Sequence, residues 1–355
     1  MPNPRPHAVN PSTSTARAIF VYKTTDYDSP SHVGLGVIAA STAKTLRTAG
    51  LWAEAWGCID AANLRVRLER ACVLAHERGQ LQPTHVVIHA PWVPTGELAA
   101  MARDYPDIVF AVVSHSNFGF LAADPHAVQL LREAVELQHS LHNVVVAGNS
   151  QRFVNAASVI WNTNVAFLPN LYDLSEPMPP ARPAWNGGAL RLGLFGACRL
   201  LKNGLTGAAS AASLAATLRV PTELYVSEKN QAMAELCDDT PNIKLIVTGW
   251  MPWAKFRQLV GSMHLLLQPS FTESFNVVTA DGVHQGVPSV VSDAIDWAPA
   301  RWQANPDDAE DLVRVAQYLL KTPQAVDDGR QALASYVAQG VQTWSSFLVP
   351  LTGTS

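Results

Sequence analysis

The feature that most limits the fold of this chain is a regular alternation of short apolar runs with longer helix-like segments. In the first half, apolar runs cover residues 18–22, 85–89, 108–114, 143–147 and 165–168. The helical patterns between them lie near residues 33–49, 61–78, 97–103, 126–141 and 150–161. This alternation predicts a parallel sheet with helices on its faces.

The alternation stops at residues 169–188, which contain five prolines and show no apolar periodicity. A stretch of this kind is typical of a linker between domains. After it, apolar runs return at residues 190–195, 222–227, 243–247, 264–268 and 289–292, with helical patterns near residues 204–218, 229–237, 253–262, 275–285 and 307–321. The sequence therefore predicts two doubly wound, Rossmann-like domains, and we expect them to face each other across a ligand-binding cleft.

The length of 355 residues also favours two domains, because single cores usually stop growing below this size. We expect a disordered lead-in at 1–16, an N-terminal acceptor-side domain at 17–172 and a linker at 173–188. A C-terminal donor-binding domain should follow at 189–322. The tail at 323–355 has a helical pattern, and we expect it to cross back to the first domain.

Charge, hydropathy and cysteine content give no sign of several functional classes. The formal net charge of −4 gives no basic field that would indicate binding to nucleic acid or to an anionic membrane. The first residues lack the apolar core of a signal peptide, and no run of apolar residues is long enough to span a membrane. The four cysteines are scattered with no CxxC pair, which fits reduced thiols in the cytoplasm.

A basic turn follows the first strand of the second half. Residues 196–204 read GACRLLKNG, with Arg199 and Lys202 just before a predicted helix. Backbone N–H groups at a helix start, a guanidinium and an ammonium can together neutralise a diphosphate. The alternative is a solvated basic turn with no ligand.

Two carboxylates, Glu273 and Asp281, stand eight residues apart in a loop and helix that follow the apolar run 264–268. A carboxylate at a helix entrance can accept hydrogen bonds from sugar hydroxyls, and one two turns further on can reach another hydroxyl of the same ligand. Taken alone, Glu273 is better explained as a helix-capping carboxylate.

Taken in order, these motifs resemble those of retaining glycosyltransferases of the GT-B fold, of the family 4 type (glycosyl transferases group 1). The matching residues are Arg199, Lys202, Pro269, Ser270, Glu273, Asp281, Gly286, Val287 and Pro288.

The resemblance implies a role for each residue. Arg199 and Lys202 would bind the donor diphosphate and stabilise it as a leaving group, while Glu273 would hold hydroxyls of the donor sugar. Asp281 would hold the ribose, although it is one methylene shorter than the usual Glu. Further donor contacts are implied for Ser274, Phe275, Asn276 and Val277 on the sugar and phosphate side, and for Thr248, Gly249, Trp250 and Met251 near the nucleobase.

The first domain carries a weaker resemblance. Gly34 and Gly36 match the family's glycine-rich loop, where glycine permits close approach to phosphate. The same stretch reads Gly-x-Gly-x-x-Ala with Asp60 at the end of the next strand, but eight polar residues separate it from the first strand, which disfavours a dinucleotide site. His115 ends the strand at 108–114, where the family places a histidine near the donor sugar.

The resemblance thus implies a metal-independent retaining glycosyltransferase that uses a nucleotide-diphosphate sugar, with UDP or GDP as the nucleotide. No Asp-x-Asp motif follows a strand, so we expect no catalytic metal and no other cofactor. The acceptor would be a hydroxyl of a glycan, a lipid-linked glycan, a small aglycone or a hydroxylated DNA base. The alternatives are a nucleotide-sugar epimerase on the same fold, a non-catalytic relative that binds sugar nucleotides, and a dehydrogenase.

Overall fold

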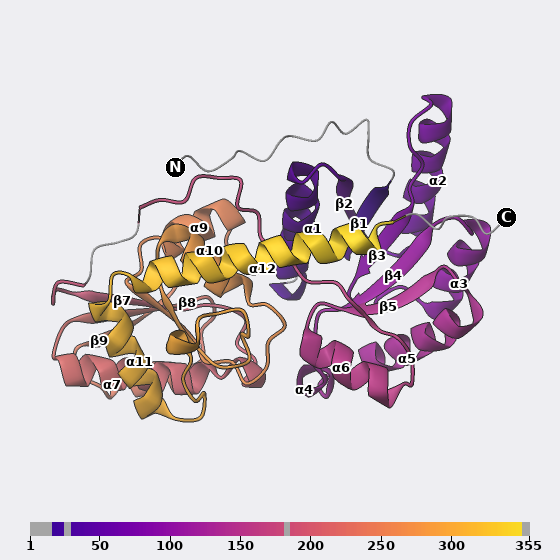
Figure 1. The fold of residues 1–355 in the computed structure, drawn as a ribbon. Coiled ribbons are helices and arrows are strands. Elements are labelled where there is room, and N and C mark those ends of the chain that lie inside the picture. Colours follow the sequence, from indigo (N-terminus) through magenta and orange to yellow (C-terminus); the bar gives the residue numbers. More distant parts are fainter. Residues whose placement is uncertain (1–15, 25–29, 181–184, 350–355) are drawn as a thin grey trace. The chain divides into compact units, whose positions relative to one another are not determined.

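The computed structural model describes the chain except residues 1–15, 25–29, 181–184 and 350–355 (Figure 1). Apart from Ala16, the predicted lead-in lies outside the described residues. The chain divides into two compact units. Unit 1 extends to Ser175 and also includes the chain from Val337 onward, and unit 2 is Glu176–Tyr336.

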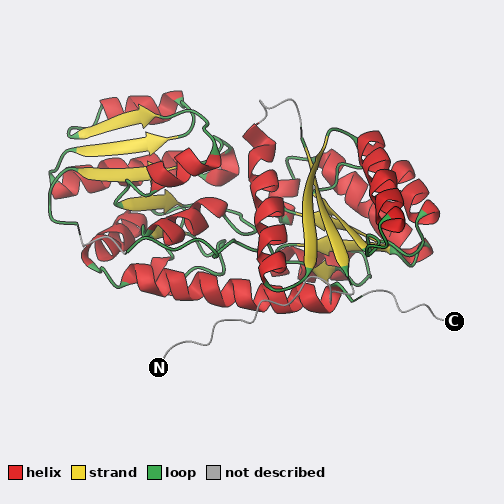
Figure 2. Cartoon of the chain, turned by 90° about the horizontal axis from the view of Figure 1, so that it is seen from above, coloured by secondary structure: helices red, strands yellow, loops and turns green. Residues whose placement is uncertain are grey.

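Unit 1 contains a parallel sheet with helices on both faces (Figure 2). Its described strands, in sheet order, are β2 (Trp52–Cys58), β1 (Arg17–Lys23), β3 (His85–His89), β4 (Val109–Ser114), β5 (Val144–Gly148) and β6 (Ala166–Phe167). Its described helices before the linker are α1 (Pro30–Thr48), α2 (Ala61–Glu77), α3 (Thr95–Asp104), α4 (Phe118–Leu121), α5 (Pro125–Ser140) and α6 (Gln151–Ile160).

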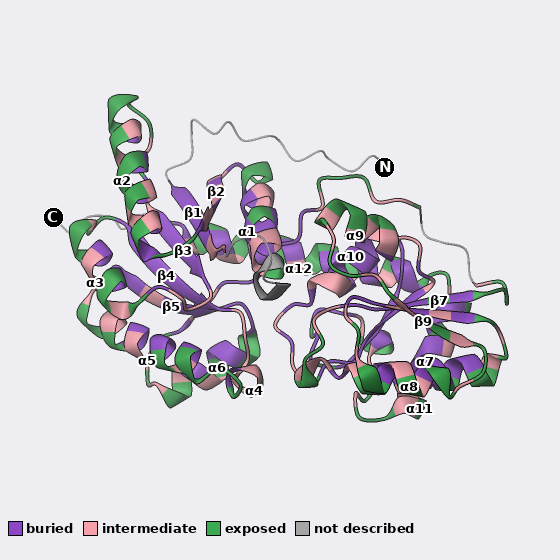
Figure 3. Ribbon diagram, turned by 180° about the vertical axis from the view of Figure 1, so that it is seen from behind, coloured by how far each residue is buried: buried purple, intermediate pink, exposed green. Residues whose placement is uncertain are grey.

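The central strands of this sheet are buried on both faces (Figure 3). Successive side chains of a strand point to opposite faces, so each strand supplies two cores. Ile19 and Val21 belong to one apolar cluster, while Ala18 and Phe20 belong to the other. The apolar runs in the sequence are continuous rather than alternating for this reason.

Unit 2 is built in the same way, around a second parallel sheet. Its described strands, in sheet order, are β11 (Ser289–Val291), β10 (Leu265–Gln268), β7 (Leu190–Leu194), β8 (Thr222–Val226) and β9 (Ile243–Val247). The described helices that follow β7 are η2 (Leu200–Lys202), α7 (Gly204–Leu218), α8 (Gln231–Asp238), α9 (Trp253–Val260), α10 (Val277–Gln285), η3 (Ala300–Trp302), α11 (Ala309–Lys321) and α12 (Ala325–Phe347).

The boundary between the units falls within α12, the last described helix. Before the boundary, the ring of Tyr336 lies 5.4 Å from the ring of Phe275 in unit 2. After it, Trp344 is buried in unit 1, where its indole N–H donates to the carbonyl of Pro169 at 2.8 Å. The ring of Trp344 also meets the ring of Phe20 on β1 edge to face, at 5.1 Å.

Each apolar run of the sequence forms a strand, and each longer helical pattern forms a helix, with ends within a few residues of those predicted. The strand β2 does not appear among the apolar runs, and only the position of Asp60 indicated it. It is an edge strand, half-buried along much of its length, and the charged Glu54 and the small Gly57 interrupt its sequence of WAEAWGC.

Candidate functional site

A pocket lies in unit 2 at the carboxyl ends of β7, β8 and β10. Its lining comes from the turn after β7, from Lys202 and Gly204, from Glu228 after β8, and from Gln268 and Ser270. In parallel α/β sheets, ligands bind beyond the carboxyl ends of the strands. The predicted donor motifs at residues 196–204 and 269–273 therefore meet at one pocket.

The turn after β7 is fixed by its backbone. Gly196 has a φ of +126°, a conformation that disfavours a side chain, and its N–H donates to the hydroxyl of Ser227 at 3.2 Å. Asn203 is left-handed, with a φ of +55°, and its amide donates to the carbonyls of Pro269 (3.0 Å) and Pro306 (2.6 Å). These bonds hold Lys202 beside the loop after β10.

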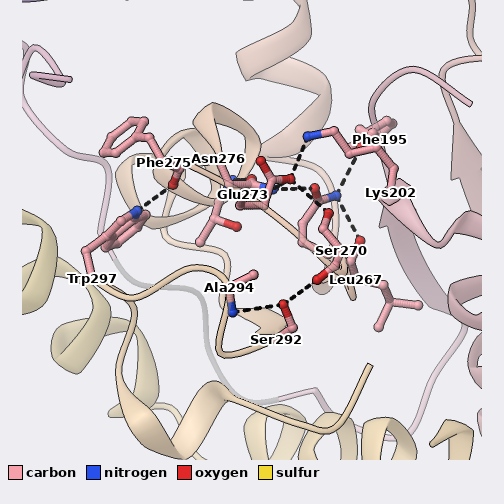
Figure 4. A network of polar contacts seen from close by, with 12 residues as sticks. Phe195, Lys202, Leu267, Ser270, Glu273, Phe275, Asn276, Ser292, Ala294 and Trp297 are labelled. Carbon is pink, nitrogen blue, oxygen red and sulfur yellow. Dashed lines mark hydrogen bonds and ion pairs between the residues drawn. The ribbon is translucent and has the colours of Figure 1, made fainter. Parts of the chain in front are cut away.

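Lys202 and Glu273 form an ion pair beside the pocket (Figure 4). The ammonium of Lys202 lies 2.6 Å from Glu273 Oε1, and the same oxygen accepts from the hydroxyl of Ser270 (2.8 Å) and the amide of Asn276 (2.9 Å). Glu273 is buried, whereas the Lys202 side chain is 32% exposed. Because three donors converge on one oxygen, the carboxylate is held in a defined position.

Asn276 connects this carboxylate to the start of α10. Its φ is +63°, and its side-chain oxygen accepts from the N–H of Thr279 at 2.8 Å, which caps the helix. Its amide also donates to Gln268 Oε1 at 3.0 Å, and Gln268 in turn donates to the carbonyl of Phe195. The network is buried and joins β7, β10 and α10, so Glu273 is positioned from three elements.

The residues next to Asn276 are also fixed. The indole of Trp297 donates to the carbonyl of Phe275 at 2.6 Å, and the two rings stack at 5.7 Å (Figure 4). Ser274 and Val277 are partly exposed on either side. The carbonyl of Phe275 is therefore engaged inside the protein.

The loop after β9 holds the residues predicted to lie near a nucleobase. The N–H of Thr248 donates to the carbonyl of Val226, and Gly249 is left-handed with a φ of +70°. The side chain of Trp250 is exposed, and its indole donates to Glu228 Oε1 at 2.9 Å. Glu228 was not among the predicted residues, although its place just after a strand of the sheet could have indicated it.

Other predicted residues lie apart from this network. Arg199 and Met251 do not line the pocket, and Arg199 is exposed. Asp281 is fully buried within α10, and both of its carboxylate oxygens accept from the indole of Trp253, at 3.1 and 3.2 Å. Its predicted contact with a ribose stays a prediction.

In unit 1, Gly34 and Gly36 lie in the first two turns of α1, which begins at Pro30, close to the predicted helix start. A side chain at Gly36 would meet the ring of Tyr22 at about 3.0 Å, whereas Gly34 has open space around it. The glycine at position 36 thus permits close packing of α1 on β1. Any contact of these glycines with phosphate stays a prediction.

His115 follows β4 and packs against His89, with ring centroids 4.7 Å apart. The amide of Asn149 lies 3.2 Å from His115 Nδ1. With that amide as donor, Nδ1 is an acceptor and the ring proton is on Nε2. Burial lowers the pKa of His115 to about 3, so the ring is neutral near pH 7. The predicted contact of His115 with the donor sugar stays a prediction.

Three histidines with lowered pKa values should make the protein sensitive to acid. Burial lowers the pKa of His85 to about 4 and holds that of His89 well below its usual range, as for His115. The unfolded chain binds protons below about pH 6.5 that the folded chain does not, so stability falls as pH drops from 6.5 towards 4. We expect a loss of about 1–2 kcal/mol per histidine by pH 5.

Urea denaturation at pH 7.5, 6.0 and 5.0 measures this loss, and His85→Gln should make the dependence shallower. An unfolding free energy that stays constant from pH 7.5 to 5.0 in the wild type would contradict the prediction.

No family model matches the chain, and no curated protein matches it in sequence. Solved structures do match it. A sucrose-phosphate synthase from Thermosynechococcus elongatus is 13% identical with a TM-score of 0.63, over 93% of this chain and 98% of that one. HepE from Anabaena, in complex with UDP and glucose, is 14% identical with a TM-score of 0.59, over 93% and 100%. An alpha,alpha-trehalose-phosphate synthase (UDP-forming) from Burkholderia vietnamiensis is 12% identical with a TM-score of 0.59, over 94% and 99%.

The fold is GT-B. The predicted fold class is thereby confirmed, while membership of family 4 stays a prediction. Within the described residues, no three His, Cys, Asp or Glu side chains are grouped so as to hold a metal ion. No described helix combines the length and the apolar character needed to cross a membrane.

Proposed function

We propose that this chain is a retaining, metal-independent glycosyltransferase that transfers a sugar from a UDP- or GDP-sugar to a hydroxyl acceptor. The observation that carries the proposal is the buried network of Lys202, Ser270, Glu273 and Asn276 beside a pocket at the strand ends of a GT-B fold. UDP is the first choice of nucleotide, since HepE was solved with UDP and glucose and the Burkholderia synthase is UDP-forming.

In this proposal, the donor diphosphate lies near Lys202 and Gly204. Gly204 is the first residue of α7, and the N–H groups of a first helical turn have no partners within the helix. These groups and the ammonium would stabilise the negative charge of the departing diphosphate. Glu273 would accept hydrogen bonds from hydroxyls of the donor sugar. We assign Arg199 a part in diphosphate binding, as the resemblance implies.

The reaction forms the bond from the acceptor oxygen to the anomeric carbon on the face from which the diphosphate leaves. The bond from the anomeric carbon to the phosphate oxygen breaks, and that oxygen takes the proton of the acceptor hydroxyl. This route needs no protein base and retains the anomeric configuration.

A panel of UDP-, GDP-, ADP- and TDP-sugars tests the proposal. We expect at least one of them, at about 100 times its Kd, to raise the melting temperature by about 3–6 °C and to be hydrolysed slowly. Transfer to a pool of hydroxyl acceptors should give a product with retained anomeric configuration by NMR. Absence of stabilisation by every nucleotide sugar would refute the donor site, and C2 inversion without transfer would identify an epimerase instead.

A further inference from the structure

Glu228 connects the loops that follow three neighbouring strands of unit 2. It lies two residues after β8, is half-buried and lines the pocket. Its Oε2 accepts the backbone N–H of Cys198 at 2.7 Å, in the turn after β7. Its Oε1 accepts the indole N–H of Trp250 at 2.9 Å, in the loop after β9. The carboxylate therefore stands between the basic turn and the exposed tryptophan.

The chemistry of a carboxylate limits what it can bind there. It accepts hydrogen bonds from hydroxyl groups, and it repels phosphate. Its two oxygens offer about four acceptor positions, and the two N–H donors occupy only two of them. Glu228 can thus accept two further hydrogen bonds while it keeps both loops in place.

Lys202, Glu228 and Trp250 follow one another in the same order as the diphosphate, ribose and base of a nucleoside diphosphate. In the proposed function, the diphosphate lies near Lys202 and the nucleobase near Trp250. The ribose joins these two groups, and its 2′ and 3′ hydroxyls are the hydrogen-bond donors between them. Glu228 is the pocket-lining carboxylate between the same two groups.

Asp281 is less suited to this role. Its side chain is fully buried, it does not line the pocket, and the indole of Trp253 donates to both of its oxygens. With no exposed surface in this structure, the Asp281 side chain is not accessible to a ribose. Glu228, in contrast, already lines the pocket.

We propose that Glu228 binds the ribose hydroxyls of the donor nucleotide and so makes the site selective for ribonucleotides. This inference rests on the proposed function and assigns the ribose contact to a residue outside the motifs that identified the site. A carboxylate that only held the two loops together would affect ribose and deoxyribose nucleotides equally.

The test measures the affinities of UDP and GDP and of their 2′-deoxy and 3′-deoxy forms by titration calorimetry on the full chain. For the nucleotide that binds, the wild type should bind the ribose form with a Kd about tenfold lower than that of at least one deoxy form. A tenfold difference in Kd corresponds to about 1.4 kcal/mol, the contribution of one hydrogen bond. Glu228→Ala should lose this preference, because release of the two loops affects both forms alike and only the ribose form also loses a hydrogen bond. The isosteric Glu228→Gln should retain part of it.

Glu223→Gln is the matched control, since Glu223 is on β8 outside the pocket, where it pairs with Arg191. It should keep the full preference. A full preference in both Glu228 variants, or its loss in Asp281→Asn with Glu228 intact, would overturn the inference and leave the proposed function standing. Absence of binding by any nucleotide to the wild type would instead refute the proposed function, and the ribose contact with it.

Discussion

Replacing Lys202 with methionine is expected to lower kcat/KM for the sugar-nucleotide donor by about 10²–10³-fold. Methionine keeps an unbranched apolar stem of similar length but removes the ammonium. In the proposed reaction, negative charge grows on the departing diphosphate, and the Lys202 ammonium at the pocket wall is placed to stabilise it. The binding of free UDP should weaken as well, because UDP carries the same diphosphate.

The Lys202→Met variant also leaves the Glu273 carboxylate without its counter-charge. Glu273 keeps its hydrogen bonds from Ser270 and Asn276, so we expect the fold to survive with reduced stability. The double variant Lys202→Met with Glu273→Gln removes both charges. It should recover stability without recovering transfer, and this separates the chemical role of the ammonium from its structural one.

Lys229→Met is the matched control for Lys202. Lys229 is an exposed lysine in the loop after β8 and does not line the pocket. In steady-state kinetics at saturating acceptor, the kcat/KM of Lys229→Met for the donor should stay within about twofold of the wild-type value. This is usual for a change of an exposed side chain away from the site. A Lys202→Met enzyme with unchanged kcat/KM would show that the diphosphate binds elsewhere.

Much of the fold was accessible from the sequence because the sheets are parallel. Both faces of such a sheet are covered by helices, so the strands appear as continuous apolar runs, as in β3 and β10. The edge strand β2 lacks this signal because much of it is half-buried. The predicted start of α1, near residue 33, lies three residues after the observed start at Pro30.

The candidate site was predicted only where its residues belong to a motif. The motifs place Lys202 and Glu273 in one donor site, and in the structure Lys202 Nζ lies 2.6 Å from Glu273 Oε1. Glu228 belongs to no such motif, and only its partners Cys198 and Trp250 reveal its place. The hydrogen bond from Trp253 to the buried Asp281 joins residues 28 positions apart, and no local pattern encodes such a contact.

Replacing Glu273 with glutamine is expected to separate sugar transfer from nucleotide binding. Glutamine is isosteric and keeps an oxygen that can accept from Ser270 and Asn276, so the loop before α10 should retain its conformation. The change removes the negative charge that would bind the hydroxyls of the donor sugar. We expect kcat to fall by about 10²-fold. The affinity for UDP should change by less than about threefold, which is less than the loss of one hydrogen bond would cause.

These effects differ from those expected for Lys202→Met, which should lower both the affinity for UDP and the rate of sugar transfer. Calorimetry with UDP and kinetics with the intact sugar nucleotide measure the two effects separately. Glu235→Gln, an exposed change on α8, should leave both unchanged. If Glu273→Gln lowers the affinity for UDP by as large a factor as it lowers kcat, Glu273 acts through Lys202 on the diphosphate. Its assignment to the sugar would then be wrong.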